Sequence, residues 1–479
     1  MSTKRTPDSL LSRRRFFKLA GGTAVAAAGS GVLPFGKWLG PVAMSEASAQ
    51  TYVPDLFYAG TDGFISLPRY PEIRSASLGG VLTHPDPFAA DALGNPRFTT
   101  YIFGFRNVTG MSDVNRAAQK NKAQHNAPMF WVNQYDPANP KDFRVRLTNL
   151  GLALRPDLFD AHTIHWHGFR NVITFFDGEP TGSVAVTAGR MFDYIYRPRE
   201  PGTYMFHCHV EDVEHVHMGM TGPVFVRPLQ NGQSIGGFTK FAYNDGDGST
   251  GYDREYAMFC SEVWGDSHWA DAHIQLPEWS DYKPDFCLLN GRVYPDTLAP
   301  NAPMNMPADA AAAALLHALP VQTDGGGDLL ANTGYEHLKY QPMSALVECN
   351  AGERVLLRFV NLGFREAAMT LAGIRMKVVG KDATPMRGRD ATDSSYWAST
   401  VSFGAGESID AIFTAPAFSG GSGSSGAGYD VYLLYDRAYE RANNLARADA
   451  AATSTPYGGR RTEVRVYPSG RPPQLLPNT

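Results

Sequence analysis

Short runs of alternating apolar and polar residues, separated by glycine, proline and asparagine, dominate most of this chain of 479 residues. Alternation with a period of two places one side of a strand in a core and leaves the other side to solvent. Such runs occur at 101–108, 142–150, 192–198, 203–210, 223–228, 256–264, 354–362, 374–380, 407–415 and 429–435. The pattern therefore predicts an all-β fold of sandwich or barrel type.

The second part of the chain repeats the first. The segment DFRVRLTNLG at 142–151 is similar to ERVLLRFVNLG at 353–363, and 185–198 is similar to 402–416. On this alignment GTYMFHCHVED at 202–212 falls opposite GYDVYLLYDRA at 428–438. A repeat of this length indicates two copies of one β-domain. We predict one domain at 50–243 and another at 253–479, joined by the Asn/Asp/Gly/Ser-rich stretch 244–252.

The first 49 residues predict an export signal. SRRRFFK at 12–18 has the twin-arginine pattern, an Ala/Gly-rich stretch follows from 19 to 33, and Ala47-Ser48-Ala49 is typical of a cleavage site. We therefore expect a periplasmic or otherwise exported protein. No other run is long and apolar enough for a bilayer, so we expect no transmembrane span in the mature chain.

Charge and cysteine content exclude several classes of protein. Lys plus Arg number 43 against 47 Asp plus Glu, so no basic excess indicates a nucleic-acid partner. Only 4 cysteines are present, too few for a disulfide scaffold. Cys260, Cys287 and Cys349 are compatible with one disulfide or with buried free thiols, and the sequence does not choose between these.

The candidate chemistry lies in HTIHWH at 162–167 and HCH at 207–209. In a strand, residues two apart share a face, so His207 and His209 point one way and Cys208 the other. By the same rule His165 and His167 share a face, and His162 takes the opposite one. If the two segments are neighbours in one sheet, they form two metal sites, joined through the backbone of Cys208.

A thiolate, imidazoles and a weak axial sulfur are the ligands of a blue-copper centre. Cys208 and His162 supply two of them, and the rest should follow in EDVEHVHMGM at 211–220. His217 and Met218 compete with His215 and Met220. We favour His215 with Met220, because their spacing leaves a loop that can fold back on one ion. A zinc site would not need the axial thioether.

These motifs resemble the copper motifs of the multicopper oxidases, the laccase-like relatives of cupredoxins. The resemblance implies two cupredoxin-like Greek-key domains, with a type 1 copper in the first, held by His162, Cys208, His215 and Met220. It also implies a second, catalytic copper site of type 2 or type 3 character at His165, His167, His207 and His209. One departure is the stretch Glu211–Glu214, which makes the spacing two residues longer than in the family. We expect a longer acidic loop there, which either steers a donor to His215 or is merely solvated.

The second copy lacks the ligands that an oxygen-reducing cluster of this family takes from it. Thr370 and Ala372 stand in the places of His165 and His167, while Tyr435, Asp436 and Arg437 stand opposite HCH. His268 and His273 have no ligand spacing and are expected at the surface. The number of copper ions at the second site is therefore left open, and a neighbouring subunit of a homotrimer is one source of missing ligands.

Three functions follow. The first is a multicopper oxidase that oxidises a phenolic or metal-ion donor and reduces dioxygen. The second is a copper nitrite reductase, with His167 and His207 on a type 2 copper. The third is a non-catalytic electron-transfer protein with a vestigial second site.

Overall fold

The computed structural model describes residues 53–68, 84–85, 97–127, 129–170, 172–301, 334–421, 428–443 and 458–479. The predicted leader at 1–49 lies outside these residues and stays a prediction. Pro54–Thr479 form one compact unit, and everything below concerns this unit. Among its described helices, none combines the length and the apolarity needed to cross a bilayer.

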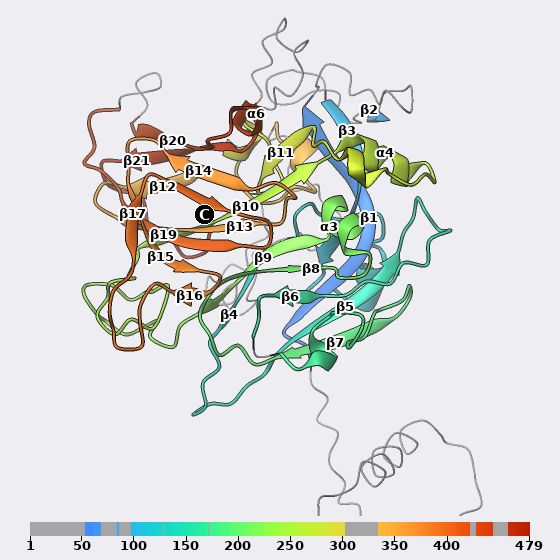
Figure 1. The fold of residues 1–479 in the computed structure, drawn as a ribbon, viewed down its shortest axis with the longest axis horizontal. Coiled ribbons are helices and arrows are strands. Elements are labelled where there is room, and N and C mark those ends of the chain that lie inside the picture. Colours follow the sequence, from blue (N-terminus) through green and yellow to red (C-terminus); the bar gives the residue numbers. More distant parts are fainter. Residues whose placement is uncertain are drawn as a thin grey trace, which may run out of the picture. The chain divides into compact units, whose positions relative to one another are not determined.

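The strands between Leu56 and Arg227, called the first half here, form two sheets (Figure 1). One has the order β2 (His84–Pro85), β3 (Arg97–Asn107), β1 (Leu56–Pro68), β5 (Phe143–Gly151) and β7 (Met191–Tyr196). The other has the order β4 (Phe130–Asn133), β9 (Thr221–Arg227), β8 (Gly202–His207) and β6 (His165–His167). Side chains from both sheets share one buried cluster, which includes Tyr58 and Phe103 from the first sheet and Phe130 and Phe206 from the second.

The strands between Arg254 and Tyr467, called the second half, form two more sheets. The larger has the order β11 (Phe286–Leu289), β10 (Arg254–Val263), β13 (Arg354–Asn361), β19 (Ser408–Thr414), β15 (Met376–Lys381) and β16 (Thr384–Pro385), with β17 (Tyr396–Ala398) also on β15. The smaller has the order β12 (Val347–Asn350), β21 (Arg461–Tyr467), β20 (Asp430–Asp436), β14 (Ala367–Leu371) and β18 (Thr400–Phe403).

The two halves are copies at the level of single hydrogen bonds, which confirms the predicted repeat. The β1–β5 pair is parallel, as is β10–β13, and Gly60 pairs with Asn149 where Cys260 pairs with Asn361. The Asn149 side chain accepts from Gly151 N at 2.8 Å, and the Asn361 side chain accepts from Gly363 N at 2.9 Å. Both copies of the NLG sequence therefore make the same turn.

All ten runs singled out by alternation contain strands of the structure, so the all-β prediction is confirmed. The predicted pairing of the two histidine segments is also confirmed. β6 runs antiparallel to β8, with His165 opposite His207. Opposite residues of an antiparallel pair project to the same face, so these two histidines lie together.

The expected acidic loop at 211–214 is wrong, because Asp212 begins a helix. Helix α3 (Asp212–Met218) carries acidic residues in its first turn, where their negative charge interacts favourably with the positive end of the helix dipole. Its preceding residue, Glu211, has a left-handed φ of 45°. The other helical segments are α2 (Asp113–Ala117), α4 (Gly265–Ala272), α6 (Tyr439–Asn443), η1 (Thr174–Phe176), η2 (Trp279–Asp281), η3 (Asp296–Leu298) and η4 (Glu336–Leu338).

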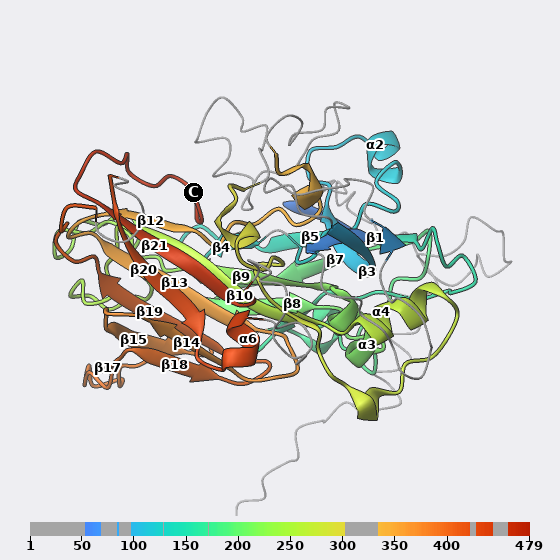
Figure 2. The ribbon, with the colours of Figure 1, turned by 90° about the horizontal axis from the view of Figure 1, so that it is seen from above.

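Polar contacts join the two halves next to the histidine segments. Thr203 in β8 donates through its hydroxyl to Asp410 in β19 at 2.5 Å, and Ser408 donates to the Thr203 carbonyl at 2.7 Å. Arg358 donates to the Thr203 hydroxyl at 3.0 Å. Helices α3 and α4, one from each half, lie side by side in both views of the chain (Figure 2).

Candidate metal centres

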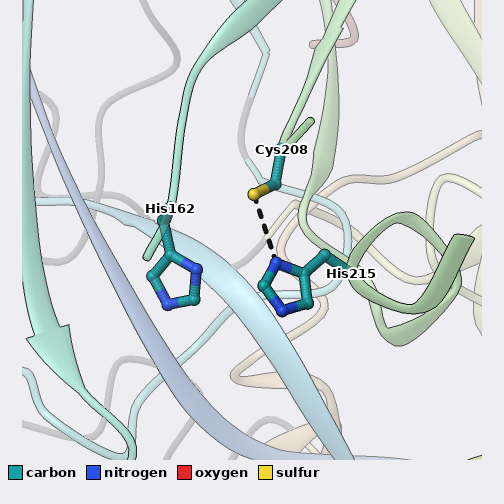
Figure 3. A group of neighbouring side chains, drawn as sticks. All are labelled: His162, Cys208 and His215. Carbon is teal, nitrogen blue, oxygen red and sulfur yellow. Dashed lines mark hydrogen bonds between the residues drawn. The ribbon is translucent and has the colours of Figure 1, made fainter. Parts of the chain in front are cut away.

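The first centre is formed by His162, Cys208 and His215, which come from three separate segments (Figure 3). A two-way backbone pairing with Val186, at 2.9 and 2.8 Å, holds the His162 backbone. Cys208 follows β8 directly, and His215 lies in α3. Their ligand atoms all lie within 4.8 Å of one another, and Cys208 Sγ is 3.2 Å from His215 Nδ1.

Met220 and Gly60 complete the surroundings of the first centre. The Cys208 amide donates to the Met220 carbonyl at 3.0 Å, so this methionine is fixed beside the thiol segment. A Cβ built at Gly60 would lie 2.7 Å from the His162 ring and 3.4 Å from the Met220 methyl group. The missing side chain of Gly60 therefore makes room for both groups.

The thiol of Cys208 is fully buried, yet its surroundings favour the thiolate. Burial alone raises its pKa, but the imidazoles of His215 and His162 outweigh burial and hold the pKa well below the usual range of a thiol. The Thr163 amide also donates to Cys208 Sγ at 3.4 Å. A thiolate is the form of cysteine that binds metal.

The donor set fits copper. Both ring nitrogens of His162 are buried without a hydrogen-bond partner. A buried nitrogen without a partner is costly, and a metal ion would compensate one of them. Two imidazoles, a thiolate and a nearby thioether are the ligands of a type 1 copper centre.

His217 points away from this centre. Its Nε2 accepts a hydrogen bond from the Trp264 amide at 3.1 Å, and its ring packs on Trp279 and Tyr282. Two residues along a helix are about 200° apart, so His215 and His217 face opposite sides of α3. The geometry therefore groups His215, and not His217, with Cys208.

The second cluster consists of the four histidines on the other side of β6 and β8. Ring centroids lie 5.1 Å apart for His165 and His207, 4.9 Å for His165 and His209, and 5.4 Å for His167 and His207. Ligand atoms of His165, His167 and His207 lie within 4.8 Å of one another. His209 joins the cluster by ring contact.

Backbone carbonyls set the tautomers of two of these rings. His165 Nδ1 donates to the Asp177 carbonyl at 2.8 Å, and His207 Nδ1 donates to the Cys208 carbonyl at 2.8 Å. Each Nε2 is then left with a lone pair, as in histidines that bind metals. Burial lowers the pKa of His165, His167 and His207, which favours the neutral, metal-binding form.

Cys208 connects the two sites. It belongs to the first centre, its chain neighbours His207 and His209 belong to the second cluster, and its carbonyl holds His207. The parity argument from the sequence predicts this division, and the strand pairing places the groups accordingly. The arrangement provides a covalent path for an electron between two metal positions.

The second half offers no equivalent site among the residues that the structure describes. Thr370 pairs with Tyr435 as His165 pairs with His207, so the aligned ligands are replaced. No group of metal-binding side chains in the described ranges includes a residue of the second half. His317 lies outside these ranges.

The surface prediction for His268 is wrong, whereas His273 is exposed as expected. His268 is 0% exposed, and its Nδ1 donates to the Tyr101 carbonyl at 2.6 Å. The second half packs its helix α4 on strand β3 of the first half, so this ring is enclosed between them. His273 stacks on Trp269 with centroids 4.0 Å apart.

The four cysteines are all described, and all are buried free thiols: Cys208, Cys260, Cys287 and Cys349. This decides the alternative that the sequence left open.

Two features of the first centre have no sequence signal. Gly60 lies far from the motifs in the chain, and Asp160, whose Oδ2 is 3.6 Å from His215 Nε2, is one of many aspartates.

Comparison with known proteins agrees with this geometry. Residues 125–231 match the family model described as multicopper oxidase. The fold is similar to a blue copper oxidase from Nitrosomonas europaea, with 18% identity, a TM-score of 0.50, and coverage of 86% of this chain and 85% of that one. It is similarly related to the multicopper oxidase mgLAC, with 19% identity, a TM-score of 0.50 and 87% coverage of both chains. No curated protein matches in sequence.

The segment 125–231, which holds both candidate metal positions, thus matches a multicopper oxidase domain, and the resemblance drawn from the motifs is confirmed. The fold is cupredoxin-like in both halves, as the neighbouring structures are. A copper-dependent oxidoreductase is the class of protein that the family and the site together support.

Proposed function

We propose that the protein is an oxidase that takes single electrons from a phenolic or metal-ion donor at the first centre and delivers them to dioxygen at the second cluster. The observation that carries this proposal is the segment His207-Cys208-His209. Its middle residue faces one group of ligands and its outer residues face another. An electron carrier with one copper would not need the second group.

Each set of residues has a separate task. His162, Cys208, His215 and Met220 would hold the type 1 copper, and His165, His167, His207 and His209 would hold the second copper site. Copper, when bound, supplies one-electron redox chemistry at both places. Full burial of the Cys208 thiol and of the His162 ring excludes water from the first centre. The carbonyl of Cys208 orients His207, and the carbonyl of Asp177 orients His165.

Copper content per chain, with electron paramagnetic resonance to type each ion, tests the proposal. We expect more than one copper, a blue type 1 signal, and oxygen uptake with a phenolic donor above the rate in buffer. One copper with a blue band and no second signal would instead select the electron-transfer protein with a vestigial second site. Nitrite-dependent gas formation with an artificial donor, without oxygen uptake, would select a copper nitrite reductase.

One observation keeps these alternatives in view. The described part of the second half brings no histidine to the second cluster, so the number of copper ions there depends on four histidines. A homotrimer whose neighbouring subunit adds ligands is part of the proposal, and the mass of the copper-loaded protein in solution tests it. Export through the twin-arginine leader is a further part, which fractionation of cells that carry an Arg13→Lys, Arg14→Lys variant tests.

A further inference from the structure

A cavity of about 520 Å³ lies between the two halves, and none of its lining residues belongs to either metal centre. The first half contributes the residues after β6 and before β8, and the second half contributes β15, β16 and the loop after them. Part of the wall is apolar, with Pro201, Val379 and Met386. Small-molecule sites have volumes of roughly 300–1,000 Å³, so this space, called the inter-half cavity here, can hold a small organic ligand.

Cationic side chains outnumber carboxylates around the inter-half cavity. The cations are Arg170, Arg199, Lys377, Arg387 and Arg389. The carboxylates are Glu200, Asp245 and Asp393. Three cations lie beside a carboxylate already, at 3.1 Å for Lys377 and Asp393, 2.7 Å for Arg387 and Asp247, and 3.6 Å for Arg170 and Glu200.

Arg199 and Arg389 are the two cations that remain. Within the described ranges of the chain, neither guanidinium makes an ion pair or a hydrogen bond. The last carboxylate does not compensate them, because Asp245 is held by its own loop. It accepts from the Thr250 amide at 2.6 Å and from the Gly248 amide at 3.0 Å. Two guanidiniums of the cavity are thus left for a ligand.

We propose that the inter-half cavity binds an organic carboxylate, with Arg199 and Arg389 as the cations that recognise it and its apolar body against Val379 and Met386. A guanidinium matches a carboxylate with two parallel hydrogen bonds. The carboxylates of the wall disfavour a multiply charged phosphate, since like charges repel. A neutral ligand such as a phenol would leave both guanidiniums unused.

Arg170 connects this cavity to the second cluster. Its side chain also lines a cavity of about 300 Å³ that reaches His167 and Asp382. The guanidinium donates to the Thr384 hydroxyl and, at 3.5 Å, to the Asp382 carbonyl. A carboxylate in the inter-half cavity competes with Glu200 for Arg170, so its binding changes the surroundings of His167. This connection rests on the proposed function, whereas the binding itself does not.

Titration calorimetry with benzoate tests the site, and benzamide, which has nearly the same shape without the charge, is the matched ligand. We expect one saturable site for benzoate and none for benzamide. Arg199→Gln and Arg389→Gln should each weaken benzoate binding roughly five- to tenfold, because each removes a charge-assisted hydrogen bond. Both side chains are exposed, so the fold tolerates the change.

Two further variants make this test sharper. Arg190→Gln removes an exposed arginine outside the cavity and should leave benzoate binding as it is in the wild-type protein. Glu200→Gln removes a carboxylate from the wall and should strengthen benzoate binding roughly two- to fivefold. Absence of saturable binding, equal affinity for benzamide, or equal weakening in Arg190→Gln would overturn the proposal.

The copper-loaded protein tests the connection through Arg170. Benzoate should change the electron paramagnetic resonance signal of the second copper site. The concentration that produces half of this change should rise five- to tenfold in Arg389→Gln, as the dissociation constant does. An unaltered concentration would mean that benzoate reaches the copper directly, and would overturn the role of Arg170.

The same measurements separate this inference from the proposed function. Oxygen uptake from a phenolic donor without saturable benzoate binding would overturn the carboxylate site and leave the oxidase standing. Saturable benzoate binding, weakened in Arg199→Gln, in a protein that takes up no oxygen with any donor would overturn the oxidase and leave the site standing.

Discussion

The two halves share one fold, but at one position of the repeat the first half carries the ligands of a candidate copper site and the second half carries an ion pair. In the first half the Cys208 amide donates to the Met220 carbonyl at 3.0 Å, and in the second half the Asp436 amide donates to the Arg460 carbonyl at 2.9 Å. The soft pair of a copper centre is thus matched by a carboxylate and a guanidinium. These two side chains are fully buried and lie 3.3 Å apart, with Glu262 2.9 Å from the same arginine.

The comparison teaches that the β-sandwich does not depend on metal at this place. Both positions lie where strands end and buried polar side chains meet. In the first half these side chains are imidazoles and a thiol, and Gly60 leaves room for the His162 ring. In the second half they are an arginine and its carboxylates, and Cys260 stands in the place of the glycine. Substitutions can test the two arrangements separately.

The largest expected effect follows from replacing Cys208, and Cys260 of the second half serves as the control. Cys208→Ser should abolish the blue band and all donor oxidation, because serine does not supply a thiolate. The matched variant, Cys260→Ser in the second half, should keep both. Absorption near the blue band and oxygen uptake measure the difference, and loss of the band in Cys260→Ser would contradict the separation.

The next effect concerns Arg460 and Met220, whose carbonyls accept the matching backbone hydrogen bonds in the two halves. Arg460→Met leaves Asp436 and Glu262 buried without their cation, and it should lower the free energy of unfolding by about 3–5 kcal/mol. Met220→Leu, its counterpart, should cost less than about 1.5 kcal/mol and change mainly the colour of the copper protein. Chemical denaturation of both variants measures this, and equal losses would show that the second half does not rely on its ions.

Acid should weaken the second half through Glu255, which Arg227 and Arg358 contact. Burial raises the pKa of this carboxyl, but the two arginines outweigh burial and lower the pKa from 4.5 to about 2. A lowered pKa stabilises the fold above the unfolded value, and this gain is lost as the pH falls from about 5 to 2. The loss amounts to roughly 3 kcal/mol, and Glu255→Gln should remove this part of the pH dependence.

Asp55 is the matched control for that experiment. It holds the same repeat position in the first half, where it pairs with the largely exposed Lys141 at 2.7 Å. Solvent screens such a pair, so Asp55→Asn should change stability by less than about 1 kcal/mol at any pH. An effect as large as that of Glu255→Gln would mean that burial does not distinguish the halves.

The smallest effect is expected at Gly60, which leaves room for the His162 ring. Gly60→Ala places a methyl group 2.7 Å from the His162 ring, so it should cost about 1–3 kcal/mol and weaken copper binding. Cys260→Ala removes one sulfur from a filled site and should cost about 1 kcal/mol without any effect on copper. A Gly60→Ala protein that binds copper normally would show that the His162 ring has room to move.

The strands, the repeat and the division of the histidines could be read from the sequence, because alternation and local spacing carry them. Parity groups His165 with His167 and His207 with His209, and the register of β6 and β8 then brings the two pairs to one face. Helix α3 could not be read, since its seven residues are too few for a helical period to emerge. The sequence did not indicate Gly60 and Asp160 either, because their places beside the first centre depend on contacts between separate segments of the chain.

The burial of His268 escaped for the same reason. Nothing near it in the sequence indicates that the Tyr101 carbonyl of the other half accepts a hydrogen bond from its ring. The identity of His215 as the group nearest to Cys208 was favoured by spacing, and the turn of α3 gives the physical reason. Short-range rules therefore locate the candidate ligands, while the packing around them follows only from the folded chain.

The turn at Gly406 gives the second half a role near the second cluster, although this half brings no histidine to it. A Cβ at this glycine would come within 3.2 Å of His167 Nε2, so the turn packs closely against that ring. A truncated protein that ends after Arg227 would thus expose that imidazole, even if it kept its blue colour. The half without candidate ligands thus covers a histidine of the half that carries them.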